Sequence, residues 1–147
     1  MSSPARRLAV LDTGVLVHYC RQDATSRAIE EQFGILDRGP ERHILSSIVE
    51  GEILALARHL GWGEDRVKRL QVVLGRLVRI DAGKRAVVDA YVELYCICRR
   101  NGQALGQNDL WIAATALAAG AELYTCDDDF SFLNPDPITV HYIPEQR

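Results

Sequence analysis

Short runs of apolar residues alternate along this chain with longer segments in which apolar residues recur every three or four positions. The short runs predict strands at residues 8–11, 43–45, 78–80, 122–125 and 138–142. The longer segments predict helices at residues 26–36, 47–60, 64–77, 83–100 and 108–120, the last one capped by Asn108. Strands that alternate with helices are typical of an α/β fold. We therefore expect a three-layer α/β/α architecture with a mainly parallel central sheet.

The composition is that of an ordinary globular protein. With 147 residues, 48% of them hydrophobic and 25% charged, the chain has the length of one compact domain, which we expect to span residues 1–147. A net charge of −3 argues against a non-specific nucleic-acid binder, but it leaves room for an enzyme with clustered catalytic carboxylates. Cys20, Cys96, Cys98 and Cys126 match neither zinc nor redox spacing and are expected to be reduced thiols.

Membrane attachment and export are not expected. The longest apolar run, residues 110–119, is shorter than the roughly 20 residues of a transmembrane helix. Residues 1–7 lack the apolar stretch of a secretory signal. We therefore expect a cytoplasmic protein.

Acidic residues gather where the predicted strands end. They are Asp12 after the first strand, Glu50 and Glu52 in the helix after the second, Asp109 in the first turn of its helix, and Asp127, Asp128 and Asp129 after the fourth strand. Functional groups of parallel sheets collect outside the carboxyl ends of the strands, so these acids are expected to converge. Oxygen ligands without histidine or thiolate suit Mg²⁺ or Mn²⁺.

Each acid also has a structural explanation. The helix dipole stabilises an acid at the position of Asp109, and residues 127–129 have the composition of a solvated turn. Ser47 and Glu50 fit a capping box, which predicts a helix cap rather than a ligand at Glu50. Glu52 is turned further toward the apolar stripe of its helix, and Asp12 ends a buried strand and needs a partner. The convergence carries the prediction more than any single acid.

Four segments together carry a resemblance to a known family. They are LDTGVL (residues 11–16), SSIVEGEI (46–53), NDLWIAATA (108–116) and LYTCDDDF (123–130). In order, spacing and total length they resemble the PIN-domain family, and within it the VapC-type toxins of bacterial and archaeal toxin–antitoxin pairs. The third and fourth segments are the most specific.

The resemblance implies a metal-dependent endoribonuclease of α/β/α architecture. By position, Asp12, Glu52, Asp109 and Asp127 would be the catalytic, metal-binding acids for Mg²⁺ or Mn²⁺, with Asp129 as an accessory metal ligand. The ions would activate a water for in-line attack on an RNA phosphodiester. By resemblance, the products would carry 5′-phosphate and 3′-hydroxyl ends.

The resemblance further implies hydroxyl positions beside these acids and protein partners. Thr13 and Thr125 occupy the hydroxyl positions, and Gly14 departs from the asparagine that usually follows Asp-Thr in the family. We expect an RNA substrate, a homodimer and a cognate antitoxin whose tail fills the acidic site. Positive residues should rim such a site, and Arg21, Arg99 and Arg100 are the candidates for phosphate contacts.

Three other functions share part of this pattern. Asp12-Thr13-Gly14 spells the triplet of aspartic proteases, but those enzymes need a β-rich chain and usually Ser or Ala where Val15 stands. A phosphotransfer domain needs a second acid where Gly14 stands and a lysine late in the chain. A catalytically inactive PIN-like module that binds RNA or protein is the remaining alternative. The retained acids argue against it, because their repulsion would serve nothing without a metal.

Overall fold

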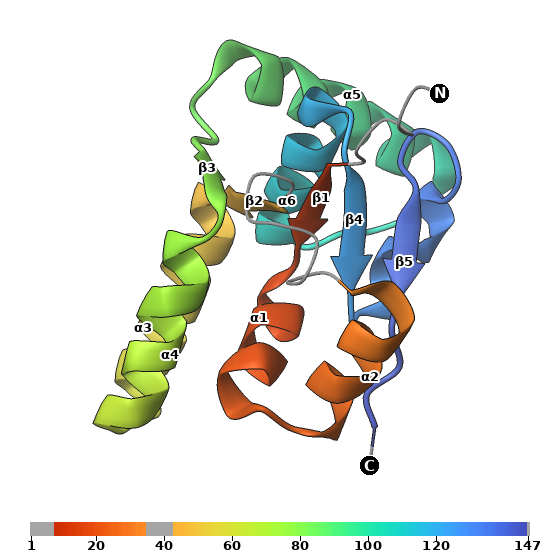
Figure 1. Ribbon diagram of the computed structural model, residues 1–147. Coiled ribbons are helices and arrows are strands. Elements are labelled where there is room, and N and C mark those ends of the chain that lie inside the picture. The colour runs from red at the N-terminus through yellow and green to blue at the C-terminus, as the bar shows by residue number, and fades with distance from the viewer. Residues whose placement is uncertain (1–7, 35–42, 147) are drawn as a thin grey trace, which may run out of the picture.

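A five-stranded sheet forms the centre of the molecule (Figure 1). The computed structural model describes residues 8–34 and 43–146. The strands are β1 (Ala9–Leu11), β2 (His43–Ser46), β3 (Val78–Ile80), β4 (Glu122–Thr125) and β5 (Val140–Tyr142), in the order β3-β2-β1-β4-β5. Every pairing between neighbours is parallel. The predicted parallel α/β sheet is confirmed.

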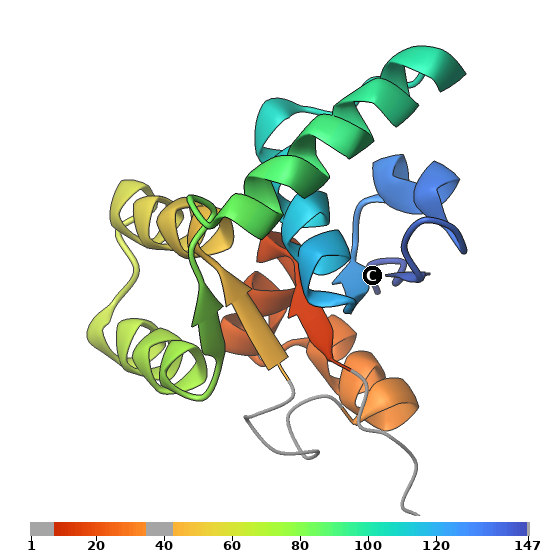
Figure 2. The ribbon, with the colours of Figure 1, turned by 90° about the horizontal axis from the view of Figure 1, so that it is seen from above.

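Helices cover both faces of this sheet. They are α1 (Thr13–Arg21), α2 (Ala24–Phe33), α3 (Ser47–His59), α4 (Glu64–Gly75), α5 (Arg85–Asn101) and α6 (Gln107–Ala119), with the short 3-10 helix η3 (Asp128–Leu133) after β4. The paired helices α5 and α6 lie on one face and α1, α2 and α4 on the other (Figures 1 and 2). Helix α3 contacts both α1 and α6. The arrangement is the expected three-layer α/β/α.

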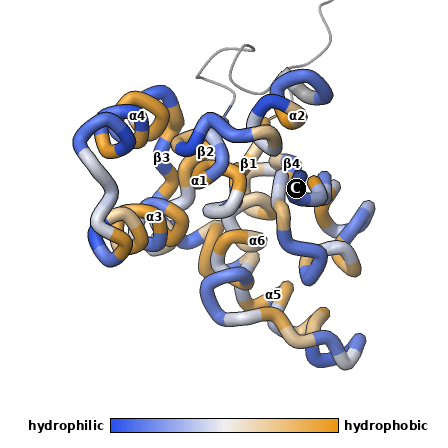
Figure 3. The backbone as a smooth tube through the Cα atoms, turned by 90° about the horizontal axis from the view of Figure 1, so that it is seen from below, coloured by the Kyte–Doolittle hydropathy of each residue, from blue (hydrophilic) through white to orange (hydrophobic). Residues whose placement is uncertain are grey.

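The core surrounds β1, β4 and α6. All three residues of β1 are buried, as parallel strands covered on both faces should be. Helix α6 is buried on most of its surface, with Ile112, Ala113 and Ala116 fully inaccessible. Figure 3 shows α6 largely hydrophobic, whereas α3 and α4 are hydrophobic on one side only. The helix whose sequence is apolar nearly all round is therefore inside the molecule, as predicted.

Besides shifts of one or two residues at element ends and the short η3, the structure differs from the predicted elements in three places. Residues 13–21 were not predicted as an element, yet they form α1, in which residues 15–20 are all buried. This helix is only nine residues long, which is too short for a helical period to be recognised along the sequence. Helix α2 begins at Ala24 instead of residue 26, and Leu36, its predicted last residue, lies outside the described residues. Helix α6 begins at Gln107 with Gly106 as its N-cap, so the prediction of Asn108 as the cap is wrong.

The sequence also made predictions about the state of the cysteines and about membrane-spanning helices. All four cysteines are free: Cys20 and Cys98 are buried, Cys126 is partly buried and Cys96 is exposed. Of the helices that the described residues form, none combines the length and the apolar surface required to cross a bilayer.

Candidate active site

A cavity of about 420 Å³ opens at the carboxyl ends of β1 and β4. It is lined by Asp12, Thr13, Gly14, Glu52, Asp109, Cys126, Asp127, Asp128 and Glu145. The structure thus brings together the four acids that the resemblance makes catalytic, Asp12, Glu52, Asp109 and Asp127. Asp129 is exposed and is not among the lining residues. Asp128 and Glu145 do line the cavity, and nothing in the sequence pattern singled out Glu145.

Asp12 is the most deeply placed acid, at 8% exposure. It follows β1 and caps α1, so its Oδ1 accepts a hydrogen bond from the Thr13 backbone N–H at 2.8 Å. The Thr125 hydroxyl, at the end of the neighbouring strand β4, donates to Oδ2 at 2.7 Å. Burial raises the pKa of Asp12, although the two hydrogen bonds lower it in part. The nearby charges of Glu52 and Asp127 raise it further. This carboxylate is rigidly held in a place that disfavours its charge.

A second hydroxyl holds Glu52. Helix α3 starts at the end of β2, where the Ser46 side chain caps it by accepting from the Ile48 N–H at 3.1 Å. This start places Glu52 so that the Thr13 hydroxyl donates to its Oε1 at 2.8 Å. The Asn108 amide approaches Oε2 at 3.5 Å. Asn108, which does not cap α6, therefore contacts the candidate site instead.

Glu50 points away from the cavity, but not because it caps the helix. Its Oε1 accepts a hydrogen bond at 2.9 Å from Nε of Arg79, a residue of β3. The Ser47 hydroxyl, the expected cap, instead accepts from the Ala82 N–H at 2.9 Å. The predicted capping box of Ser47 and Glu50 is thus wrong, because Ser46 is the N-cap and both box residues have partners elsewhere in the fold.

Asp127 and Asp109 complete the acidic lining. The Thr125 hydroxyl that binds Asp12 also accepts from the Asp127 N–H at 2.9 Å, and Asp127 Oδ1 caps η3 by accepting from the Asp129 N–H at 2.9 Å. Asp109 lies in the first turn of α6. Burial raises the pKa of Asp109 to about 6, and the charges of Asp12, Asp127, Glu52 and Asp129 add to the shift in that order. Burial and the neighbouring carboxylates together make Asp109 easier to protonate than a free aspartate.

The lining fits a hard divalent cation by its chemistry. Its acidic ligands offer carboxylate oxygens only, and a cation would relieve the repulsion that raises the pKa of Asp109. Among residues 8–34 and 43–146, no three His, Cys, Asp or Glu side chains are already grouped as a metal site. The acids share a cavity without meeting at one point, so binding would draw them together.

Cys126 lines the cavity, and three arginines were predicted to lie at its rim. Burial raises the pKa of the Cys126 thiol to about 12, with Glu145, Asp12 and Asp23 adding to the shift. Because the thiol stays protonated, it is a poor nucleophile. Arg21, Arg99 and Arg100 are exposed, and none of them lines the acidic cavity.

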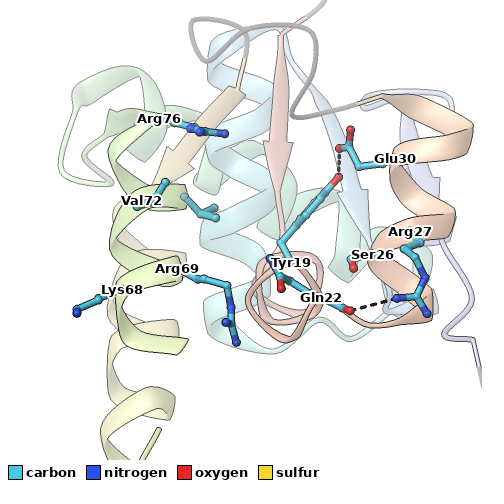
Figure 4. A pocket seen from close by; sticks show the side chains of 10 residues that line it. Tyr19, Gln22, Ser26, Arg27, Glu30, Lys68, Arg69, Val72 and Arg76 are labelled. Atoms are coloured by element: carbon cyan, nitrogen blue, oxygen red, sulfur yellow. Dashed lines mark hydrogen bonds between the residues drawn. The ribbon is translucent and has the colours of Figure 1, made fainter. Parts of the chain in front are cut away.

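A second cavity, of about 780 Å³, has the opposite character (Figure 4). It lies between α1, α2 and α4, and we call it the cationic groove. Its charged lining residues are Arg27, Lys68, Arg69, Arg76 and Glu30, and Val72 and Val73 contribute apolar surface. Arg69 Nε is fixed by donating to the Cys20 carbonyl oxygen at 2.9 Å. The sequence analysis missed this groove, although the spacing of the cations in α4 puts them on one helical face.

Comparisons with known proteins agree with the fold. A sequence model of the PIN domain, a family whose members are generally nucleases, matches residues 9–133. No curated protein sequence matches the chain significantly. The structure of VapBC2 from Rickettsia felis, bound to a promoter DNA fragment, aligns with a TM-score of 0.75 and 26% identity over 92% of this chain and 98% of that one.

Two further solved structures share the fold at lower identity. A toxin–antitoxin complex from Klebsiella pneumoniae has a TM-score of 0.66 and 21% identity, covering 90% of this chain and 95% of that one. FitAcB from Neisseria gonorrhoeae has a TM-score of 0.68 and 22% identity, covering 90% and 96%. With the family match over most of its length and the acids at the ends of a parallel sheet, this chain belongs to the PIN-domain family.

Proposed function

We propose that this protein is a Mg²⁺- or Mn²⁺-dependent endoribonuclease and the toxin of a toxin–antitoxin pair. The observation that carries the proposal is the shared cavity of Asp12, Glu52, Asp109 and Asp127. Family membership supports a nuclease, and the similarity to VapBC2 and other toxin–antitoxin structures supports the toxin role.

Asp12, Glu52, Asp109 and Asp127 would hold the cation, with Asp129 as an accessory ligand. A bound Mg²⁺ or Mn²⁺ supplies Lewis-acid chemistry, because it activates a water and stabilises charge that develops on the phosphodiester. The chain itself orients the carboxylates. Thr125 orients Asp12, and Thr13 orients Glu52, so both carboxylates line the cavity before a cation draws the acids together.

Partners follow from the comparisons and from the two cavities. Because similar structures are toxin–antitoxin complexes, we propose that a cognate antitoxin binds this chain. The homodimer is proposed from the family resemblance alone. The cationic groove offers a docking surface with positive rims and apolar surface from Val72 and Val73. A complementary partner segment would carry acidic and apolar side chains.

The test is hydrolysis of a structured RNA by purified protein freed of host nucleases. We expect cleavage with Mg²⁺ or Mn²⁺, none with EDTA, and a loss of several orders of magnitude in Asp12→Asn. Asp65→Asn, an exposed acid at the start of α4, is the matched control and should cleave like the wild type. The Asp12→Asn protein should keep its circular dichroism spectrum.

Equal cleavage by wild type and Asp12→Asn would rule out the catalytic proposal. RNA binding without cleavage by either protein, at any metal concentration, would instead favour the inactive binding module considered in the sequence analysis.

A further inference from the structure

The chain after β5 returns to the candidate site. Beyond Tyr142, the Ile143 N–H donates to the Thr125 carbonyl oxygen at 2.8 Å, which continues the pairing with β4. Three residues later, the Gln146 N–H donates to the hydroxyl of the buried Thr25 at 2.8 Å, at the start of α2 (Figure 1). The segment 143–146 is therefore tied at both ends, and it bridges β4 and α2.

Glu145 lies between these two ties and lines the acidic cavity. Its Oε1 is 3.5 Å from Nε2 of His18, a residue of α1 whose side chain is only 10% exposed. The Glu145 side chain itself is 63% exposed. One oxygen thus faces a buried histidine, while most of the side chain stays open to solvent and to the cavity.

His18 is in turn fixed by Asp23. The His18 Nδ1 and Asp23 Oδ2 are 2.6 Å apart. The other oxygen of Asp23 caps α2 by accepting from the Ser26 N–H at 3.0 Å. A chain of contacts therefore runs from the start of α2 through Asp23 and His18 to Glu145.

We propose that Glu145 is a further acid of the divalent-cation site and that His18 is the residue that positions it. The inference rests on the proposed function, since it adds a carboxylate to the cation site that Asp12, Glu52, Asp109 and Asp127 would form. It also gives a function to the histidine buried between two acids, because burial of a polar side chain is unfavourable by itself. Without the His18 contact, the repulsion from the acids of the cavity would drive Glu145 outward into solvent.

The test measures Mn²⁺ binding to the full-length protein, by the electron paramagnetic resonance signal of free Mn²⁺ at fixed pH. Glu145→Gln should weaken Mn²⁺ binding by about 10-fold or more, because loss of an acid of the site should cost at least as much as loss of an outer partner. The matched control is Glu122→Gln, which also removes one carboxylate that faces a histidine, since Glu122 Oε2 is 3.3 Å from His141 Nε2. Glu122 lies at the opposite end of β4, so its loss should leave Mn²⁺ binding unchanged.

Two variants of His18 separate positioning from a purely structural role. Asparagine places an amide donor near the position of Nδ1, toward Asp23, whereas glutamine places one near Nε2, toward Glu145. We expect His18→Asn to weaken Mn²⁺ binding about as much as Glu145→Gln does, and His18→Gln to restore most of it. In the double variant His18→Asn/Glu145→Gln, the two losses should not add, because both act through one contact. Additive losses, or equal losses in His18→Asn and His18→Gln, would overturn the positioning role.

The outcomes distinguish this inference from the proposed function. If Asp12→Asn abolishes Mn²⁺ binding while Glu145→Gln binds like Glu122→Gln, the acidic site stands and the role of Glu145 is wrong. If wild type and Asp12→Asn bind Mn²⁺ equally, the proposed site itself fails. Faster RNA cleavage by Glu145→Gln with unchanged Mn²⁺ binding would also overturn the inference, because Glu145 would then only repel phosphate.

Discussion

Hydroxyl groups and backbone amides, not positive side chains, hold the acids of the candidate site. Thr125 and the Thr13 N–H bind Asp12, the Thr13 hydroxyl binds Glu52, and no Lys or Arg of the described residues lines the cavity. Hydrogen bonds orient a carboxylate but leave its charge in place, so the acids continue to repel one another. Burial, and after it this repulsion, raise the pKa of Asp109.

At this scale, neutralising Asp109 should stabilise the metal-free protein. The pKa of Asp109 is about 6 in the folded protein and near 3.8 in the unfolded chain, so the folded protein binds the proton more tightly. The free energy of unfolding therefore falls as the pH rises from about 4 to about 6. After a discount for solvent screening, the effect is roughly 1–2 kcal/mol. Loss of the acid from the helix start removes roughly 0.3–1 kcal/mol of that gain.

Thermal unfolding in EDTA checks this prediction. Asp109→Asn should melt above the wild type at pH 8, and the difference should shrink or reverse at pH 4. Asp65→Asn is the control, since Asp65 also lies in the first turn of a helix, and it should show only the small helix-start loss. A gain for Asp109→Asn that is the same at both pH values would contradict the explanation by charge.

At the scale of elements, the sequence pattern was sufficient where an element has a distinct period or position. The strands at residues 78–80 and 122–125 have their predicted bounds. The helical period correctly turned Glu52 toward the cavity and Glu50 away from it. The pattern failed for α1, which is only nine residues long, and for the cap of α3. Two adjacent serines, Ser46 and Ser47, precede that helix, and only the distant Ala82 N–H decides which of them caps it.

The corrected cap gives a prediction for α3. Ser46→Ala removes the N-cap hydrogen bond and should lower the free energy of unfolding by roughly 0.5–2 kcal/mol. Glu50→Ala loses only a partly exposed ion pair with Arg79 and should lower the free energy of unfolding less than Ser46→Ala does. Urea unfolding of both variants makes the comparison, with Arg79→Ala expected to match Glu50→Ala. A larger loss in Glu50→Ala than in Ser46→Ala would return the cap to Ser47 and Glu50.

At the scale of the whole molecule, the site follows from the topology. In the order β3-β2-β1-β4-β5, the chain builds outward from β1 first on one side and then on the other, and the acidic cavity opens where β1 and β4 meet. Parallel sheets commonly bind ligands at such a reversal point. Convergence of the acids was therefore predictable from the strand ends. The place of Glu145 was not, because the 143–146 segment has no period and its tie to Thr25 joins residues 121 positions apart.

Cation binding to the acidic site should raise the stability of the whole fold. A cation that binds only the folded protein stabilises it by about 2.7 kcal/mol at 100 times its Kd. For a chain of this size, that corresponds to a rise in Tm of roughly 5–11 °C. We expect such a rise with Mg²⁺ for the wild type at pH 8, a smaller one for Asp109→Asn and none for Asp12→Asn.

The same rise should depend on pH, since the cation must displace the proton of Asp109 below its pKa of about 6. Differential scanning calorimetry at pH 8 and pH 5 should therefore show a larger Mg²⁺ effect at pH 8 for the wild type. In Asp109→Asn, that proton is gone, so the Mg²⁺ effect should differ less between the two pH values. An equal rise in Tm for wild type, Asp109→Asn and Asp12→Asn would show that Mg²⁺ acts elsewhere and that these acids do not share a cation.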